Sequence, residues 1–107
     1  AMLDSTGETS EVKGTVFLQK DTYPNDPLFH QQWYLSDANI LPVWNDYTGR
    51  GVNIGVFEVQ GVMDVNHPDL IANINQETID ANWTADEHAT LVSGVIGAAR
   101  NDIGGVG

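Results

Sequence analysis

Residues 87–99 read EHATLVSGVIGAA, and this stretch indicates most clearly how part of the chain folds. Leu91, Val95 and Ala98 or Ala99 recur at the spacing of one face of an α-helix. Asp86 stands just before the run, where a short carboxylate can accept hydrogen bonds from the free N–H groups of a first helical turn. The pattern predicts a helix that begins at about His88.

His88 occupies the first turn of this predicted helix. The amino terminus of a helix carries partial positive charge, which favours the neutral imidazole that a general base requires. Histidines at helix starts are nevertheless more often ordinary surface or core residues. The helix alone therefore does not assign a catalytic role to His88.

Two further segments give the helix a context. Residues 51–58 read GVNIGVFE, a short β-branched run that ends at the carboxylate of Glu58, and the motif His67-Pro68-Asp69-Leu70 begins nine residues later. We expect a strand over residues 52–57, followed by a loop, an acidic polar stretch and the helix. This order predicts an α/β architecture with a parallel sheet.

Together with residues 88–94 (HATLVSG), these segments resemble the amino-terminal half of the catalytic domain of the subtilases, the subtilisin-, kexin- and furin-like serine proteases. Residues 25–35 (NDPLFHQQWYL) resemble the start of a mature kexin- or furin-like catalytic domain. The resemblance covers about residues 25–107. It implies the amino-terminal portion of a subtilisin-like fold, with a parallel sheet and flanking helices. That fold is incomplete in 107 residues, because it requires roughly 250 to 300.

The composition suggests two regions. Residues 1–24 are rich in Ser, Thr, Glu and Gly, and we interpret them as a linker or prosegment tail that is partly disordered. By the resemblance, residues 25–107 are expected to form the amino-terminal half of a subtilase-like catalytic domain. Two short helical stretches are expected there, at 28–34 and 37–44. Asp37 is placed to cap the second, although Pro42 would be unusual inside it.

The charge, the lack of cysteine and the hydropathy of the chain argue against several kinds of partner and linkage. Fifteen acidic residues against four basic ones give a formal charge of −11, which disfavours nucleic acid or an anionic membrane as a partner. The chain contains no cysteine, so disulfides are excluded. No apolar run approaches the length of about 20 residues that a membrane span needs. By the resemblance the protein is secreted or extracellular.

The resemblance also implies catalytic residues. His88 takes the position of the general base, and Glu58 takes that of the carboxylate that orients it, where the family has aspartate. Glutamate can orient a histidine in this way. Two alternatives stay open, because Glu58 could be an ordinary strand-end acid and Asp64 is a rival carboxylate. Ala89 replaces the family glycine that follows the histidine, and its methyl group could be absorbed or could hinder the pocket.

The nucleophilic serine and the oxyanion-hole asparagine belong, by the resemblance, to the carboxy-terminal half of the catalytic domain. Ser93 corresponds to a small packing residue. The chain alone is therefore expected to be inactive. Its partners would be that carboxy-terminal half, in the same or another chain, and the peptide substrate of the complete protein. The apolar faces of the expected strand and helix would be covered by elements that this chain lacks.

A calcium site is also implied by the resemblance. The expected ligands are two carboxylates, one side-chain amide and three backbone carbonyls, from Asp26, Asp69, Asn101, Ala99, Ile103 and Gly105. Oxygen ligands of this kind suit a hard divalent cation. The alternative is that residues 101–105 form a simple polar turn after the helix.

The sequence is compatible with three functions. The first is a piece of a calcium-dependent subtilisin- or kexin-like serine endopeptidase. The second is a catalytically degenerate subtilase-like module that acts as a calcium-stabilised structural or binding domain of a larger extracellular protein. The third is a split half that regains a fold only with its complement. The changes at Glu58 and Ala89 favour the second function more than an ordinary subtilase sequence would.

Overall fold

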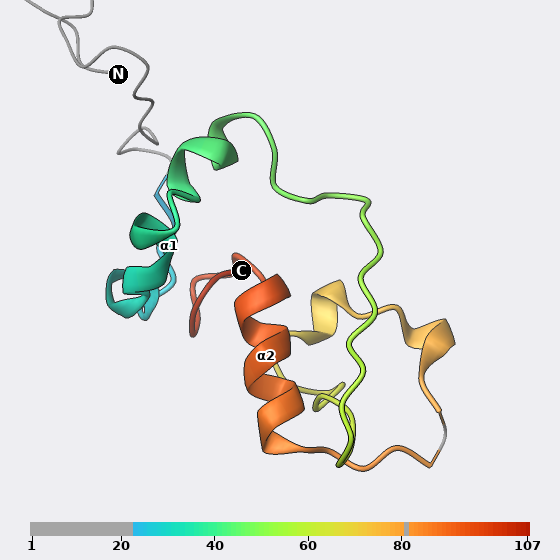
Figure 1. The fold of residues 1–107 in the computed structure, drawn as a ribbon. Helices are drawn as coiled ribbons and strands as arrows, with labels where there is room; N and C mark the ends of the chain where they lie inside the picture. Colours follow the sequence, from blue (N-terminus) through green and yellow to red (C-terminus); the bar gives the residue numbers. More distant parts are fainter. Residues whose placement is uncertain (1–22, 81) are drawn as a thin grey trace, which may run out of the picture. The chain divides into compact units, whose positions relative to one another are not determined.

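A computed structural model describes residues 23–80 and 82–107 of the chain (Figure 1). The chain divides into two compact units. Among the described residues, the first comprises Tyr23 and residues 33–52, and the second comprises residues 24–32, 53–80 and 82–107. Apart from residues 23 and 24, the predicted linker or prosegment tail lies outside the described residues. Both candidate sites belong to the second unit.

The first unit contains α1 (Trp33–Asp37) and the 3-10 helix η3 (Leu41–Asn45). The predicted helix over 37–44 with Asp37 as its cap is wrong, because Asp37 is the last residue of α1. Asn39 adopts a left-handed φ of 57°, and the Ile40 N–H closes the helix end on the Leu35 carbonyl at 2.8 Å. Pro42 then stands in the first turn of η3, where a backbone N–H is not needed.

The predicted helical stretch over 28–34 is also interrupted. Its first part is the 3-10 helix η2 (Phe29–Gln31), which belongs to the second unit. The stretch ends there because Gln32 leaves helical geometry, with ψ at 66°, and α1 begins at the following residue.

The main element of the second unit is α2 (Glu87–Gly97), which appears in orange in Figure 1. The prediction that Asp86 caps this helix is confirmed, since its Oδ2 accepts a hydrogen bond from the Ala89 N–H at 2.9 Å. Two 3-10 helices precede α2, η4 (Ile71–Asn73) and η5 (Gln76–Thr78). At the other end of α2, the Asn73 side chain donates to the Gly97 carbonyl at 2.9 Å.

The cap gives a simple test of the α2 boundary. Asp86→Ala is expected to lower the free energy of unfolding by about 1 kcal/mol, because the Ala89 N–H loses its acceptor. Thermal or urea unfolding measures the loss. Glu87→Ala is the matched control, since the Glu87 side chain is exposed and is not the cap. Equal effects of the two substitutions would contradict the role of Asp86.

The expected parallel sheet is a wrong prediction. Residues 23–80 and 82–107 contain no named strand, and the expected strand at 52–57 is not part of any sheet. One isolated parallel bridge joins Val62 to Ala85, through the Val62 N–H to Thr84 carbonyl bond (3.0 Å) and the Asp86 N–H to Val62 carbonyl bond (2.8 Å). The β-branched run has the composition of a strand, but a strand also requires neighbours that accept and donate its backbone hydrogen bonds.

The core of the second unit is small. Its buried apolar residues are Phe29, Val65, Leu70, Ala89, Ala98, Ala99 and Val106. The predicted apolar stripe is not buried within α2, because Leu91 and Val95 are exposed and the buried Ala98 and Ala99 lie beyond the last residue of the helix. Phe57 and Val59 are 94% and 99% exposed. Within the second unit we call six of the exposed apolar residues, Ile54, Phe57, Val59, Leu91, Val95 and Ile96, the open apolar residues.

Candidate functional site

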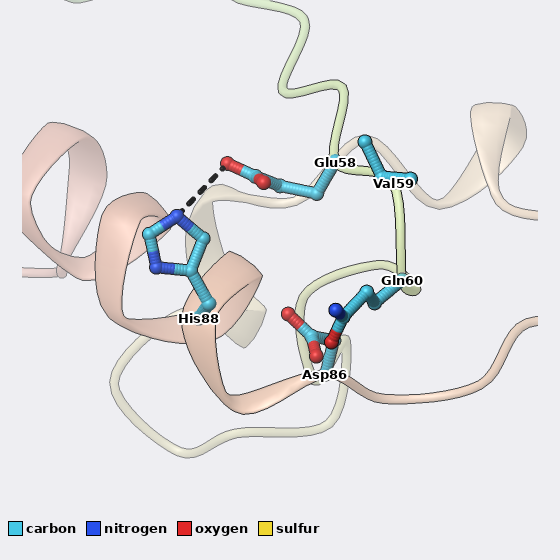
Figure 2. A pocket seen from close by; sticks show the side chains of 5 residues that line it. All are labelled: Glu58, Val59, Gln60, Asp86 and His88. Atoms are coloured by element: carbon cyan, nitrogen blue, oxygen red, sulfur yellow. Dashed lines mark ion pairs between the residues drawn. The ribbon is translucent and has the colours of Figure 1, made fainter.

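The first candidate site lies at the amino terminus of α2. His88 is the second residue of the helix, and Glu58 comes from the segment that leads into the Val62–Ala85 bridge. Their side chains are in contact, with His88 Nε2 3.5 Å from Glu58 Oε1 (Figure 2), and the contact is an ion pair when the imidazole is protonated. The His88 side chain is 70% exposed and that of Glu58 is 24% exposed. The structure thus brings together the two residues that the sequence suggested as a catalytic pair.

Hydrogen bonds join the segment that follows Glu58 to α2 and to the residues just before this helix. Besides the Val62–Ala85 bridge, the Asp64 N–H donates to the Thr90 hydroxyl oxygen at 2.9 Å. The Thr90 hydroxyl in turn donates to the Asp86 carbonyl at 2.8 Å. A Cβ added at Gly61 would lie 2.7 Å from the Thr84 carbonyl oxygen, so this close approach of the two segments requires glycine.

A pocket of about 310 Å³ opens beside the ion pair. It is lined by Glu58, Val59, Gln60, Asp86 and His88 (Figure 2). Two of the five lining side chains are carboxylates and one is an imidazole, so the pocket has groups that can hold and transfer a proton. The His88 side chain is the more exposed of the two, so a group from outside this unit can reach it.

The other residues considered at this site have local roles. The Asp64 carboxylate accepts the Asn66 N–H at 3.0 Å and so closes a turn. Ala89 is fully buried, so its methyl group packs into the unit and leaves the pocket clear. Ser93 is buried, and its hydroxyl donates to the Ala89 carbonyl one turn earlier at 2.7 Å.

The second candidate site surrounds the loop that follows α2, residues 98–106. Two carboxylates from distant parts of the chain bind its backbone. Asp26 Oδ2 accepts the Asn101 N–H at 3.0 Å, and Asp69 Oδ2 accepts the Gly105 N–H at 3.0 Å. Asp26 is 1% exposed and Asp69 is 7% exposed. The other oxygen of each, Oδ1, is buried without a hydrogen-bond partner.

The loop itself presents further oxygen atoms. Among the described residues, no backbone N–H donates to the carbonyl oxygens of Ala99, Ile103 or Gly105. The Asn101 side-chain oxygen accepts the Ile103 N–H at 3.1 Å, and its amide nitrogen reaches the Pro68 carbonyl at 3.4 Å. Gly104 has a left-handed φ of 57°, and a Cβ there would collide with Asp69 Oδ2.

These residues fit a hard divalent cation. A buried carboxylate oxygen without a hydrogen-bond donor is costly unless a positive charge compensates it. Two such oxygens flank a loop that also carries backbone carbonyls, and carboxylate and carbonyl oxygens are the ligand types that calcium prefers. No group of three or more His, Cys, Asp or Glu side chains that could hold a metal occurs among the residues described, so any cation here depends on backbone and amide oxygens as well.

Two residues important to these sites were not singled out from the sequence. The Gln32 side chain pairs with the backbone of Val106, 74 positions away. The Thr90 hydroxyl joins the loop at Asp64 to the first turn of α2. Each stands inside a segment that resembles the family, and that was the only signal available for them.

Several known proteins are similar in sequence to most of this chain. Human neuroendocrine convertase 2 (Homo sapiens) is 38% identical over 113 aligned positions, covering 81% of this chain and 17% of the relative. Bovine furin (Bos taurus) is 34% identical over 111 positions, covering 83% and 14%. The chain is homologous to the subtilisin/kexin-like serine proteases. A PC3-like endoprotease variant B of Hydra vulgaris is 39% identical over 71 positions, covering 55% of this chain and 10% of the relative.

The homology to these proteases concerns one segment of them. The chain spans about a sixth of the length of the convertase 2 and furin relatives it matches. No family model and no solved structure matches the chain. None of the helices described is long and apolar enough to cross a membrane.

Proposed function

We propose that the chain is part of a secreted, calcium-dependent subtilisin/kexin-like serine endopeptidase, in which His88 is the general base and Glu58 is the carboxylate that orients it. The homology supports the type of protein. The observation that carries the residue roles is the 3.5 Å contact between Glu58 and His88 beside a pocket. This pair would cleave peptide bonds together with a serine that the chain does not supply.

The chemistry follows from the functional groups. As the serine oxygen attacks the peptide carbonyl, the imidazole of His88 takes the serine proton and then passes it to the leaving amine. The negative charge of Glu58 stabilises the imidazolium that forms between these two steps. The carboxylate also fixes the orientation and the tautomer of the ring.

The ring of His88 must turn for this mechanism. Glu58 now faces Nε2, at a distance longer than the roughly 2.7–2.9 Å of a charge-assisted hydrogen bond. Presenting Nδ1 to Glu58 and leaving Nε2 for the serine requires rotation about both the Cα–Cβ and the Cβ–Cγ bonds, since a half turn about Cβ–Cγ alone would put Cε1 where Nε2 now lies. The exposure of the His88 side chain permits this rotation, and such contacts often tighten only when a catalytic site is complete.

The carboxy-terminal half of the catalytic domain would complete the site. Ser93 is unsuitable as a nucleophile because its hydroxyl is buried and already donates within α2. The open apolar residues support a covering partner, since Phe57 and Val59 expose almost their whole side chains. We therefore assign the nucleophile and the oxyanion donors to the half that would cover these residues.

Calcium would be held by the second candidate site. Asp26, Asp69 and Asn101 would supply side-chain oxygens, and Ala99, Ile103 and Gly105 would supply carbonyls. The bound cation would neutralise the two buried carboxylates and thereby stabilise the loop after α2. The support is the pair of buried, unpartnered oxygens on Asp26 and Asp69.

The proposal predicts that the 107-residue chain alone hydrolyses no peptide. Incubation with a fluorogenic peptide, with and without calcium, should give no signal above the buffer background, because the chain lacks the nucleophile. The full-length protein under the same conditions is the control and should be active with calcium. Hydrolysis by the chain that persists through repurification would contradict the division of the active site between two halves.

The second candidate is a catalytically degenerate module that acts as a calcium-stabilised structural or binding domain. One observation favours it, namely Glu58 where the resemblance implies aspartate. Ala89 does not, because its methyl group is buried and leaves the pocket clear. The two candidates differ in the full-length protein, since only the first requires peptide hydrolysis that depends on His88. Calcium binding is common to both.

A further inference from the structure

The side chain of Gln32 binds both backbone groups of a single residue near the end of the chain. Its Nε2 donates to the Val106 carbonyl at 2.8 Å, and its Oε1 accepts the Val106 N–H at 2.9 Å. Val106 is 4% exposed, so these backbone groups are shielded from water. The amide of Gln32 thus takes the place that a neighbouring strand would occupy.

This contact is the last of three between the lead-in segment, residues 24–32, and the loop after α2. Asp26 Oδ2 accepts the Asn101 N–H near the start of the loop. The Leu28 N–H donates to the Gly104 carbonyl at 2.8 Å. Gln32 then binds Val106, the residue immediately after Gly105, whose carbonyl is a proposed calcium ligand. The lead-in segment therefore follows the loop along its length.

Gln32 and Asp69 act on adjacent residues of that loop. Asp69 accepts the N–H of Gly105, while Gln32 holds both polar backbone groups of Val106. Gly105 also lies close to the Gln32 amide, because a Cβ added there would be 3.0 Å from Oε1. The orientation of the peptide units on both sides of Gly105 is thereby restricted.

We propose that Gln32 is a positioning residue for calcium, holding the loop in its binding conformation without being a ligand. This inference rests on the calcium site of the proposed function. An amide is required because it both donates and accepts, and a side chain of the same length without these groups leaves Val106 with two buried, unpaired polar groups. A loop that must be ordered during binding has a lower affinity than one ordered beforehand.

The test compares Gln32→Met with Gln31→Met in the full-length protein. Methionine has a similar length, adds no charge and removes the donor and acceptor. Gln31 is the adjacent glutamine with an exposed side chain, so it controls for the substitution itself. Two quantities are measured. One is the calcium dissociation constant, by titration calorimetry. The other is the rate of backbone hydrogen exchange in the metal-free protein, read from the peptide that contains Val106.

We expect Gln32→Met to weaken calcium binding about tenfold and to accelerate exchange at Val106 about tenfold, while Gln31→Met changes neither by more than twofold. Gly105→Ala should weaken binding in the same direction, because its methyl group displaces the Gln32 amide. Unchanged exchange of the peptides from α2 shows that the fold is retained.

Two results overturn parts of this account separately. If the wild type binds calcium and Gln32→Met binds it within twofold of the wild type, the positioning role is wrong and the calcium site stands. If the wild type binds no calcium, the metal site of the proposed function is wrong. In that case faster exchange at Val106 in Gln32→Met would still show that the Gln32 side chain holds the Val106 backbone. Unchanged exchange would refute this role of Gln32.

Discussion

Calcium is expected to raise the thermal unfolding midpoint of the full-length protein, and Asp69→Asn is expected to remove most of that rise. A cation that binds only the folded state stabilises it by RT ln(1 + [L]/Kd), about 2.7 kcal/mol at a hundredfold excess over Kd. Asp26, Asp69 and Asn101 are far apart in sequence, so the site exists only when their segments are docked. Metal binding is therefore coupled to folding.

Asp102→Asn is the matched control for this experiment. Asp102 lies in the same loop, is exposed and is not among the proposed ligands. It should therefore retain the calcium-dependent shift. Magnesium should replace calcium poorly, because a site with several carbonyl ligands suits the larger and less geometrically demanding ion. A wild-type midpoint that does not move with calcium would rule out the site. An equal shift in Asp69→Asn would rule out this ligand assignment.

Glu58→Gln is expected to lower the kcat of the full-length enzyme by about 10⁴-fold while KM changes little. The analogous change in a serine-protease triad keeps the geometry and leaves the histidine in the wrong tautomer. Steady-state kinetics with one peptide substrate measures both constants. Asp64→Asn is the control, because the Asp64 carboxylate closes a local turn and makes no ion pair with His88 in the described structure.

A loss below tenfold in Glu58→Gln would remove Glu58 from the triad. A large loss in Asp64→Asn would transfer the orienting role to that residue. If kcat falls in both variants and the unfolding midpoint does not change, the segment from 58 to 64 affects catalysis by the way it packs against α2.

The start of α2 could be predicted from the sequence because its determinants are local. Asp86 reaches an N–H three residues away, and this contact follows from residue type and helical geometry alone. The sheet could not be predicted in the same way. Residues 52–57 have the composition of a strand, but whether they pair depends on distant segments, and the described chain supplies one bridge at Val62.

The candidate sites show the same division between local and distant determinants. The resemblance suggested Glu58 and His88 as a pair, and the structure places their side chains in contact, although their catalytic roles stay a prediction. Gln32 could not be assigned a partner from sequence, because its contact with Val106 spans 74 positions and uses backbone groups that every residue has. Only the folded loop identifies it.

The most direct test of the proposed function is covalent labelling of the full-length protein with a serine-directed phosphonate. The account predicts that one serine outside this chain is labelled, and that His88→Ala lowers the labelling rate by orders of magnitude because the serine loses its general base. His30→Ala is the control, since His30 is exposed and lies outside the pocket. Absence of labelling in the wild type, or an unchanged rate in His88→Ala, would contradict the account.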